Sequence, residues 1–210
     1  MTTGEFCYLL DMEDGHFVNG QSHKNINDII EKFSFFKHGS AEHINFFSNI
    51  FVSTFKYKIN KKNRLYDFFY EATTNNEYVV VMSPGYRNIK AAINLMLDIS
   101  IPKINSFLYS KNLTPMITIK LPRLADKNKN YASLNKEERF KTSIKTDHIL
   151  MGRNFYNDAD KKINVIYVDD VFATGTSSKR ILEHAKRSGA NSVIAFFCFL
   201  YIKILFRAIF

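Results

Sequence analysis

The sequence predicts an α/β fold in which a parallel sheet of about five strands is flanked by helices on both faces. Three short apolar runs, at residues 78–82, 116–120 and 165–168, are typical of strands that are buried on both sides. The first and third runs are each followed by a short loop and then by apolar residues at helical spacing. Because parallel strands need crossover connections, this alternation favours the α/β class.

Residues 1–77 are expected to form a hood over this domain, because they carry helical patterns and no catalytic motif. Residues 5–12 are a candidate first strand, and a helical pattern begins near Asn25 and ends in the sequence KHGS. A clearer helix follows, with Ser40 as a candidate N-cap, and a shorter helical run covers residues 65–72. The apolar face of the clearer helix consists of Ile44, Phe47, Phe51 and Phe55.

A domain at 78–210 is expected to begin with the strand at 78–82. The loop after this strand reads SPGYR, and helical spacing resumes at Ala91. In an open parallel sheet, ligands bind at the carboxyl ends of the strands. Ser83, Gly85 and Arg87 are therefore candidates for binding an anion, although a Pro-Gly pair is equally typical of a plain turn.

A long, polar, lysine-rich stretch follows the strand at 116–120. A connection of this length inside a compact domain is more often a functional lid than a structureless loop. We therefore predict a flexible lid over residues 123–147, with a disordered loop as the alternative.

The most informative stretch is residues 163–179, which reads INVIYVDDVFATGTSSK. Asp169 and Asp170 stand where the strand is expected to end, and a loop of small, hydroxylated residues follows them. Helical spacing then continues to Gly189, a residue type that commonly stops helices. The loop's N–H groups and hydroxyls are suited to surround a phosphate at the start of that helix, because the helix dipole favours an anion there.

The two carboxylates just before the loop are placed to accept hydrogen bonds from the hydroxyls of a ribose that carries this phosphate. Two common nucleotide-binding motifs are excluded. No Gly-Lys-Ser/Thr sequence follows the strand, which excludes a Walker loop, and no G-x-G-x-x-G sequence occurs, which excludes a dinucleotide-binding fingerprint. A structural turn that contains two aspartates is the remaining alternative.

The sequence VIYVDDVFATGTSS resembles the motif of type I phosphoribosyltransferases that binds phosphoribosyl pyrophosphate (PRPP). This resemblance implies their parallel-sheet fold, Mg²⁺ with PRPP as co-substrate, and a nitrogen nucleophile, such as a nucleobase, as acceptor. It also implies that Asp169 and Asp170 hold the ribose hydroxyls and the water shell of the metal. The loop residues implied to hold the 5′-phosphate are Ala173, Thr174, Gly175, Thr176 and Ser177. Many family members carry Thr or Ser where this chain has Ala173.

The lid contains a second resemblance. The pattern R…NYASLNKEERFKTSI is similar to a segment of the ComF-like branch of phosphoribosyltransferases, and Arg123, Leu134, Glu138 and Arg139 carry the match. This implies that Arg123 or Arg139, together with Arg87, meets the pyrophosphate. The chain departs from the branch because it has no N-terminal cysteine zinc finger. A non-catalytic protein that binds PRPP or a nucleotide, and a competence-associated protein that acts with DNA, remain as alternatives.

The net charge and the cysteine content bear on the binding partners and on the cellular compartment. The formal charge of +9 suits a polyanionic ligand, nucleic acid or an anionic membrane surface. Nucleic acid and a second copy of the chain, in a homodimer, are therefore kept as candidate partners beside the small-molecule substrates. Two distant cysteines, Cys7 and Cys198, and no visible signal peptide favour a reducing cytoplasm.

The end of the chain is expected to form a last strand at 193–199 and a packed apolar tail. Lys203 and Arg207 interrupt the tail, so no transmembrane span is expected. An amphipathic tail on a membrane or partner surface is the alternative.

Overall fold

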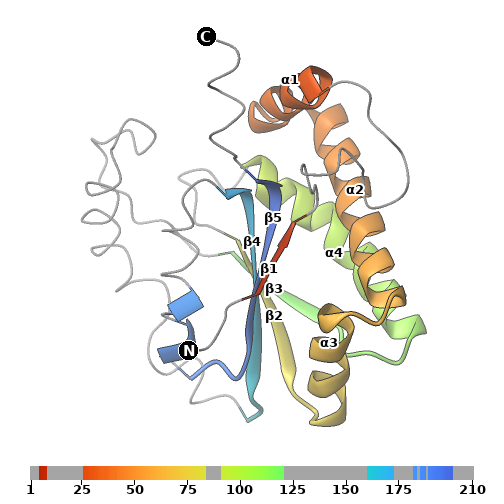
Figure 1. Cartoon of the computed structure of the whole chain (residues 1–210), viewed down its shortest axis with the longest axis vertical. Coiled ribbons are helices and arrows are strands. Elements are labelled where there is room, and N and C mark those ends of the chain that lie inside the picture. Colours follow the sequence, from red (N-terminus) through yellow and green to blue (C-terminus); the bar gives the residue numbers. More distant parts are fainter. Residues whose placement is uncertain are drawn as a thin grey trace.

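A computed structural model describes residues 5–8, 26–83, 91–120, 160–172, 182–183, 185–187 and 189–200. The strands in these ranges form one parallel sheet, ordered β1-β5-β4-β2-β3 (Figure 1). This confirms the α/β class and a parallel sheet flanked by helices. The strands are β1 (Glu5–Tyr8), β2 (Tyr78–Ser83), β3 (Met116–Lys120), β4 (Ile163–Phe172) and β5 (Val193–Leu200). The helices are α1 (Ile26–Lys37), α2 (Ala41–Asn60), α3 (Arg64–Thr74) and α4 (Ala92–Ser110).

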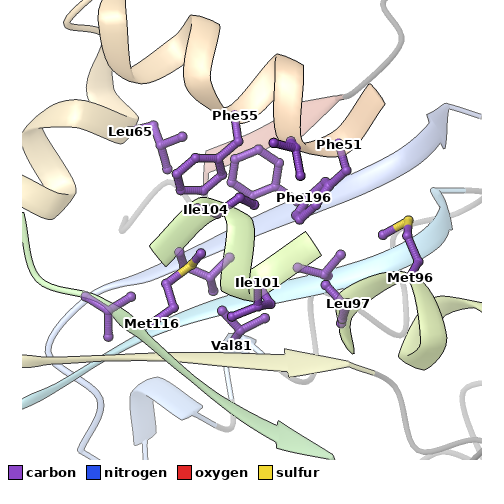
Figure 2. Packing of buried hydrophobic residues seen from close by; sticks show 14 of the residues in the cluster. Phe51, Phe55, Leu65, Val81, Met96, Leu97, Ile101, Ile104, Met116 and Phe196 are labelled. Atoms are coloured by element: carbon purple, nitrogen blue, oxygen red, sulfur yellow. The ribbon is translucent and has the colours of Figure 1, made fainter. Parts of the chain in front are cut away.

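One face of the sheet is covered by α1–α4, which Figure 1 shows together on one side. Alternate residues of the strands, such as Val81, Ile166 and Phe196, point into this layer because side chains alternate between the faces of a strand. Figure 2 shows Phe51 and Phe55 of α2 beside Phe196, and the ring centroids of both lie 6.0 Å from that of Phe196. The predicted apolar face of this helix is therefore confirmed as a core surface.

The described parts of the segment 1–77, residues 5–8 and 26–77, are joined to this core. Helices α1–α3 contribute to the same hydrophobic cluster as α4 and the sheet, and β1 pairs with β5 at one edge. The side chain of Asn105 also ties this layer to the sheet, because it both accepts from and donates to the backbone of Met116 at the start of β3. In the described part of the chain, helices α1–α3 thus form one layer with α4.

The opposite face of the sheet carries a smaller cluster, which includes Tyr167 and Ala195. Helical residues at 182–183 and 185–187 cover it and bury Leu182. Gly189 adopts φ +107°, a left-handed conformation that glycine reaches without strain, and its N–H donates to the carbonyl of Lys186 at 3.1 Å. The predicted helix stop at Gly189 is confirmed.

A buried polar cluster joins the amino ends of three strands. Glu77, just before β2, is 6% exposed, and its Oε2 accepts hydrogen bonds from Nδ2 of Asn164 at 2.8 Å and of Asn191 at 2.9 Å. Asn164 belongs to β4, and Asn191 lies two residues before the start of β5. The carboxylate therefore sets the relative positions of the strand starts, because a buried amide donor needs an acceptor.

Glu77→Ala is expected to lower the free energy of unfolding by about 3 kcal/mol, because it removes the charged acceptor of two hydrogen bonds and leaves the amides of Asn164 and Asn191 only their longer bonds of 3.3 Å. Glu71→Ala on α3 is the matched control, since Glu71 is exposed and its loss should change stability by less than about 0.5 kcal/mol. Urea denaturation measures both. Equal losses in the two variants would show that the cluster does not stabilise the strand starts.

Thr54→Val is expected to raise the free energy of unfolding by about 1 kcal/mol. Thr54 on α2 is 1% exposed, and its hydroxyl has no hydrogen-bond partner within the described residues. Valine keeps the shape and removes this unsatisfied group. Thr73→Val is the control, because its hydroxyl donates to Phe69 and accepts from the N–H of Thr114. Thermal unfolding should show opposite signs for the two variants, and destabilisation by Thr54→Val would contradict the prediction.

Candidate functional site

The strand order places a topological switch point between β2 and β4. From β2 the chain passes through α4 to β3 on one side, and it later returns to β4 on the other side of β2. The carboxyl ends of these two neighbouring strands lie together, since Met82 is in register with Tyr167. In open α/β sheets, ligands bind outside the carboxyl ends of the strands at such a point.

Strand β4 is longer than the sequence predicts. We expected it to end at Asp169 and Asp170, whereas it continues to Phe172. The prediction is wrong because β5 provides a hydrogen-bonding partner along this stretch, with Asp169 paired to Phe197 and Phe172 paired to Leu200. Strand β2 ends at Ser83, so both acidic residues belong to the part of β4 that extends beyond β2. Asp169 and Asp170 therefore lie at the switch point as residues of β4 itself, and not in the loop that follows it.

The carboxylate of Asp169 is held by a buried tyrosine. The hydroxyl of Tyr167 donates to Oδ2 of Asp169 at 2.8 Å. Tyr167 is 0% exposed, whereas Asp169 is half-buried. The two residues share one face of the sheet because they are two positions apart in a strand. The site therefore contains a carboxylate that solvent can reach, and a buried hydroxyl group holds its orientation.

The hydroxyl of Ser83, a predicted anion-binding residue, is engaged in the core. It donates to Oδ1 of Asn94 on α4 at 2.6 Å, and both residues are nearly fully buried. Its neighbour Met82 points into the smaller cluster on the opposite face, so Ser83 points toward the helical layer. The hydrogen bond ties the last residue of β2 to the helix that follows the next loop.

The other predicted site residues lie outside the described residues. These are Gly85 and Arg87 of the first loop, Arg123 and Arg139 with the lid at 123–147, and Ala173, Thr174, Gly175, Thr176 and Ser177. The backbone of Asp170 is described as part of β4. The structure therefore brings Ser83, Asp169 and Asp170 to one end of neighbouring strands.

Two residues at this end, Tyr167 and Asn94, were not among the predicted ones. A tyrosine in an otherwise aliphatic strand, two positions before an acid, was the available signal, because strand alternation puts such a pair on one face. The signal for Asn94 was weaker, since it is a polar residue at an otherwise apolar helix start.

The possible metal ligands at the carboxyl ends of β2 and β4 are the carboxylate oxygens of Asp169 and Asp170. Such oxygens suit hard cations such as Mg²⁺. Within the described ranges, no group of three or more His, Cys, Asp or Glu side chains is arranged to hold a metal ion. Across those same ranges, we find no helix with the length and apolar character needed to cross a membrane.

No protein-family model matches the chain, and no curated protein shows a significant match to it.

Proposed function

We propose that the chain is a phosphoribosyltransferase, which transfers the ribose 5-phosphate of PRPP to a nitrogen nucleophile, such as a nucleobase, and releases pyrophosphate. The position of the acidic pair carries the proposal. Asp169 and Asp170 lie at the switch point, in the part of β4 that extends beyond β2. A ligand-binding position in the sheet thus coincides with the sequence motif that resembles a PRPP-binding loop.

Each part of the substrate has a proposed partner. Asp169 and Asp170 accept hydrogen bonds from the ribose hydroxyls, and residues 173–177 hold the 5′-phosphate. Arg87, with Arg123 or Arg139, contacts the pyrophosphate. Asp169 and Asp170 are also the residues that would hold Mg²⁺ through its water shell, and the ion would neutralise part of the pyrophosphate charge.

The reaction requires the bond between the ribose C1 and the pyrophosphate to break as the nucleophile adds, through a transition state with positive charge on the sugar ring. Fixed carboxylates near the ring stabilise this charge without having to reorient. Asp169 suits this role because it is half-buried and its carboxylate is already hydrogen-bonded. Positioning and electrostatics therefore make the main catalytic contribution that we assign to the chain.

Asp169→Asn combined with Asp170→Asn is expected to weaken PRPP binding by about 3–6 kcal/mol, because two charge-assisted hydrogen bonds are lost. The fold should persist, since the amide oxygen of the asparagine that replaces Asp169 can still accept from the hydroxyl of Tyr167. Isothermal titration calorimetry with Mg²⁺ and PRPP measures the change. Asp160→Asn is the control, because Asp160 bonds Tyr78 at the opposite end of the strands. Unchanged affinity in a folded double variant would remove the acidic pair from the site.

Binding without turnover is the nearest alternative, because a fold and a binding site do not establish a reaction. Release of pyrophosphate from PRPP, measured with a panel of nucleobases, separates the two. Tight binding of PRPP with no release for any base would favour a protein that senses PRPP or a nucleotide.

A second candidate function, association with nucleic acid, is favoured by one surface. The end of α2, the turn after it and the start of α3 carry Lys56, Lys58, Lys61, Lys62 and Arg64, which we call the basic α2–α3 surface, and no acidic residue occurs between positions 43 and 66. Aromatic rings are interleaved with these cations. The Nζ of Lys61 lies 5.6 Å from the ring centroid of Tyr57, and that of Lys62 lies 5.8 Å from Tyr66. Cations beside aromatic rings are typical of surfaces that bind single-stranded nucleic acid.

Lys61→Glu combined with Lys62→Glu is expected to weaken binding of a single-stranded oligonucleotide and to flatten its salt dependence. Removal of two phosphate contacts should reduce the slope of log K against log salt by roughly 1.4. Fluorescence anisotropy across a salt series measures this slope. Arg187→Glu is the control, because Arg187 belongs to the helical residues on the opposite face of the sheet. No binding by the wild type, or equal effects of both changes, would exclude this surface.

A further inference from the structure

The hydroxyl of Tyr167 is hydrogen-bonded to Asp169, whose carboxylate is the one described at the site. Tyr167 is fully buried in β4, and its hydroxyl donates to Oδ2 of Asp169 at 2.8 Å. The donor comes from inside the smaller core, and the acceptor stands on the same strand face at the switch point. A charge-assisted bond of this kind is stronger than one between neutral groups.

The packing around Tyr167 needs its ring but not its hydroxyl. Its partners on the neighbouring strands are Met82 of β2 and Ala195 of β5, and all three belong to the same cluster. The small side chain of Ala195 leaves room beside the ring. Phenylalanine would fill this volume equally well, and it would avoid the burial of a polar group, which is unfavourable without a partner. Packing alone therefore does not account for a tyrosine here.

We propose that Tyr167 is a positioning residue, which holds the Asp169 carboxylate in its ligand-binding orientation before the ribose arrives. A carboxylate has about four acceptor positions, so the bond from Tyr167 does not by itself prevent ribose hydroxyls from donating to it. A half-buried aspartate side chain otherwise loses rotamer freedom when a ligand binds, and that loss weakens binding. With the bond from Tyr167 in place, the carboxylate is already ordered. This inference rests on the proposed function, because it assigns the ribose of PRPP as the ligand.

The chain contains a matched control, a second tyrosine–aspartate pair. The hydroxyl of Tyr78, at the start of β2, donates to Oδ1 of Asp160 at 3.2 Å, and this bond and the charge of Asp160 raise the pKa of Tyr78 above its usual value. The pair is exposed and lies at the amino ends of the strands. Tyr78→Phe therefore removes the same kind of hydrogen bond away from the switch point.

The test compares Tyr167→Phe and Tyr78→Phe by calorimetry with Mg²⁺ and PRPP, and by thermal unfolding. Tyr167→Phe should bind PRPP about tenfold more weakly, the loss expected for one hydrogen bond to a charged group. Tyr78→Phe should bind as the wild type does. Because Tyr167→Phe keeps the ring, its melting temperature should stay within a few degrees of the wild type.

A double-mutant cycle separates positioning from a general effect on structure. If Tyr167 acts through Asp169, Tyr167→Phe should have little further effect in the Asp169→Ala background, since the side chain that it orients is already gone. An equal tenfold loss in both backgrounds would overturn the inference, and so would unchanged PRPP affinity in folded Tyr167→Phe. If the wild type binds no PRPP, the proposed function fails and the inference fails with it, a result distinct from the other two.

Discussion

The burial of β4 between two neighbouring strands is the constraint on which the rest of the structure depends. Residues 163–168 are buried without exception, and all of them except the polar Asn164 belong to one of the two hydrophobic clusters. Ile166 and Val168 pack under the helical layer, whereas Val165 and Tyr167 pack on the other side. A strand that serves both cores cannot shift by one residue, because that would exchange its two faces. The acidic residues that follow are therefore held at a defined place.

The polar groups at the two ends of the sheet have different roles. At the amino ends, Glu77 joins Asn164 and Asn191 in a closed network that positions the strands. At the carboxyl ends, a buried hydroxyl bonds a half-buried carboxylate, in the pair Tyr167 and Asp169. A network closed in the interior stabilises the fold, while a carboxylate that remains accessible to solvent can also bind a ligand. This division is typical of α/β proteins, whose sites lie at the carboxyl ends of their strands.

The helical layer links the N-terminal third of the chain to the site, and the described residue that it places there is Asn94 of α4. Phe51 and Phe55 of α2 pack on Phe196 of β5, and α4 begins beside the end of β2 through the bond between Ser83 and Asn94. The same layer carries the basic α2–α3 surface on its solvent side. One element thus packs against the core with its apolar face and presents cations to solvent with the other.

The sequence by itself determined the local elements: the aliphatic runs of the strands, the apolar face of α2 and the helix stop at Gly189. These follow from periodicity and from backbone preferences, which act over a few residues. Tertiary structure decided the strand order, the extension of β4 through Asp169 and Asp170 along β5, and the bond from Ser83 to Asn94. Each of these depends on which partner a group meets across the fold. A one-dimensional pattern shows that a strand can form, but its end is set by the neighbouring strand that completes its hydrogen bonds.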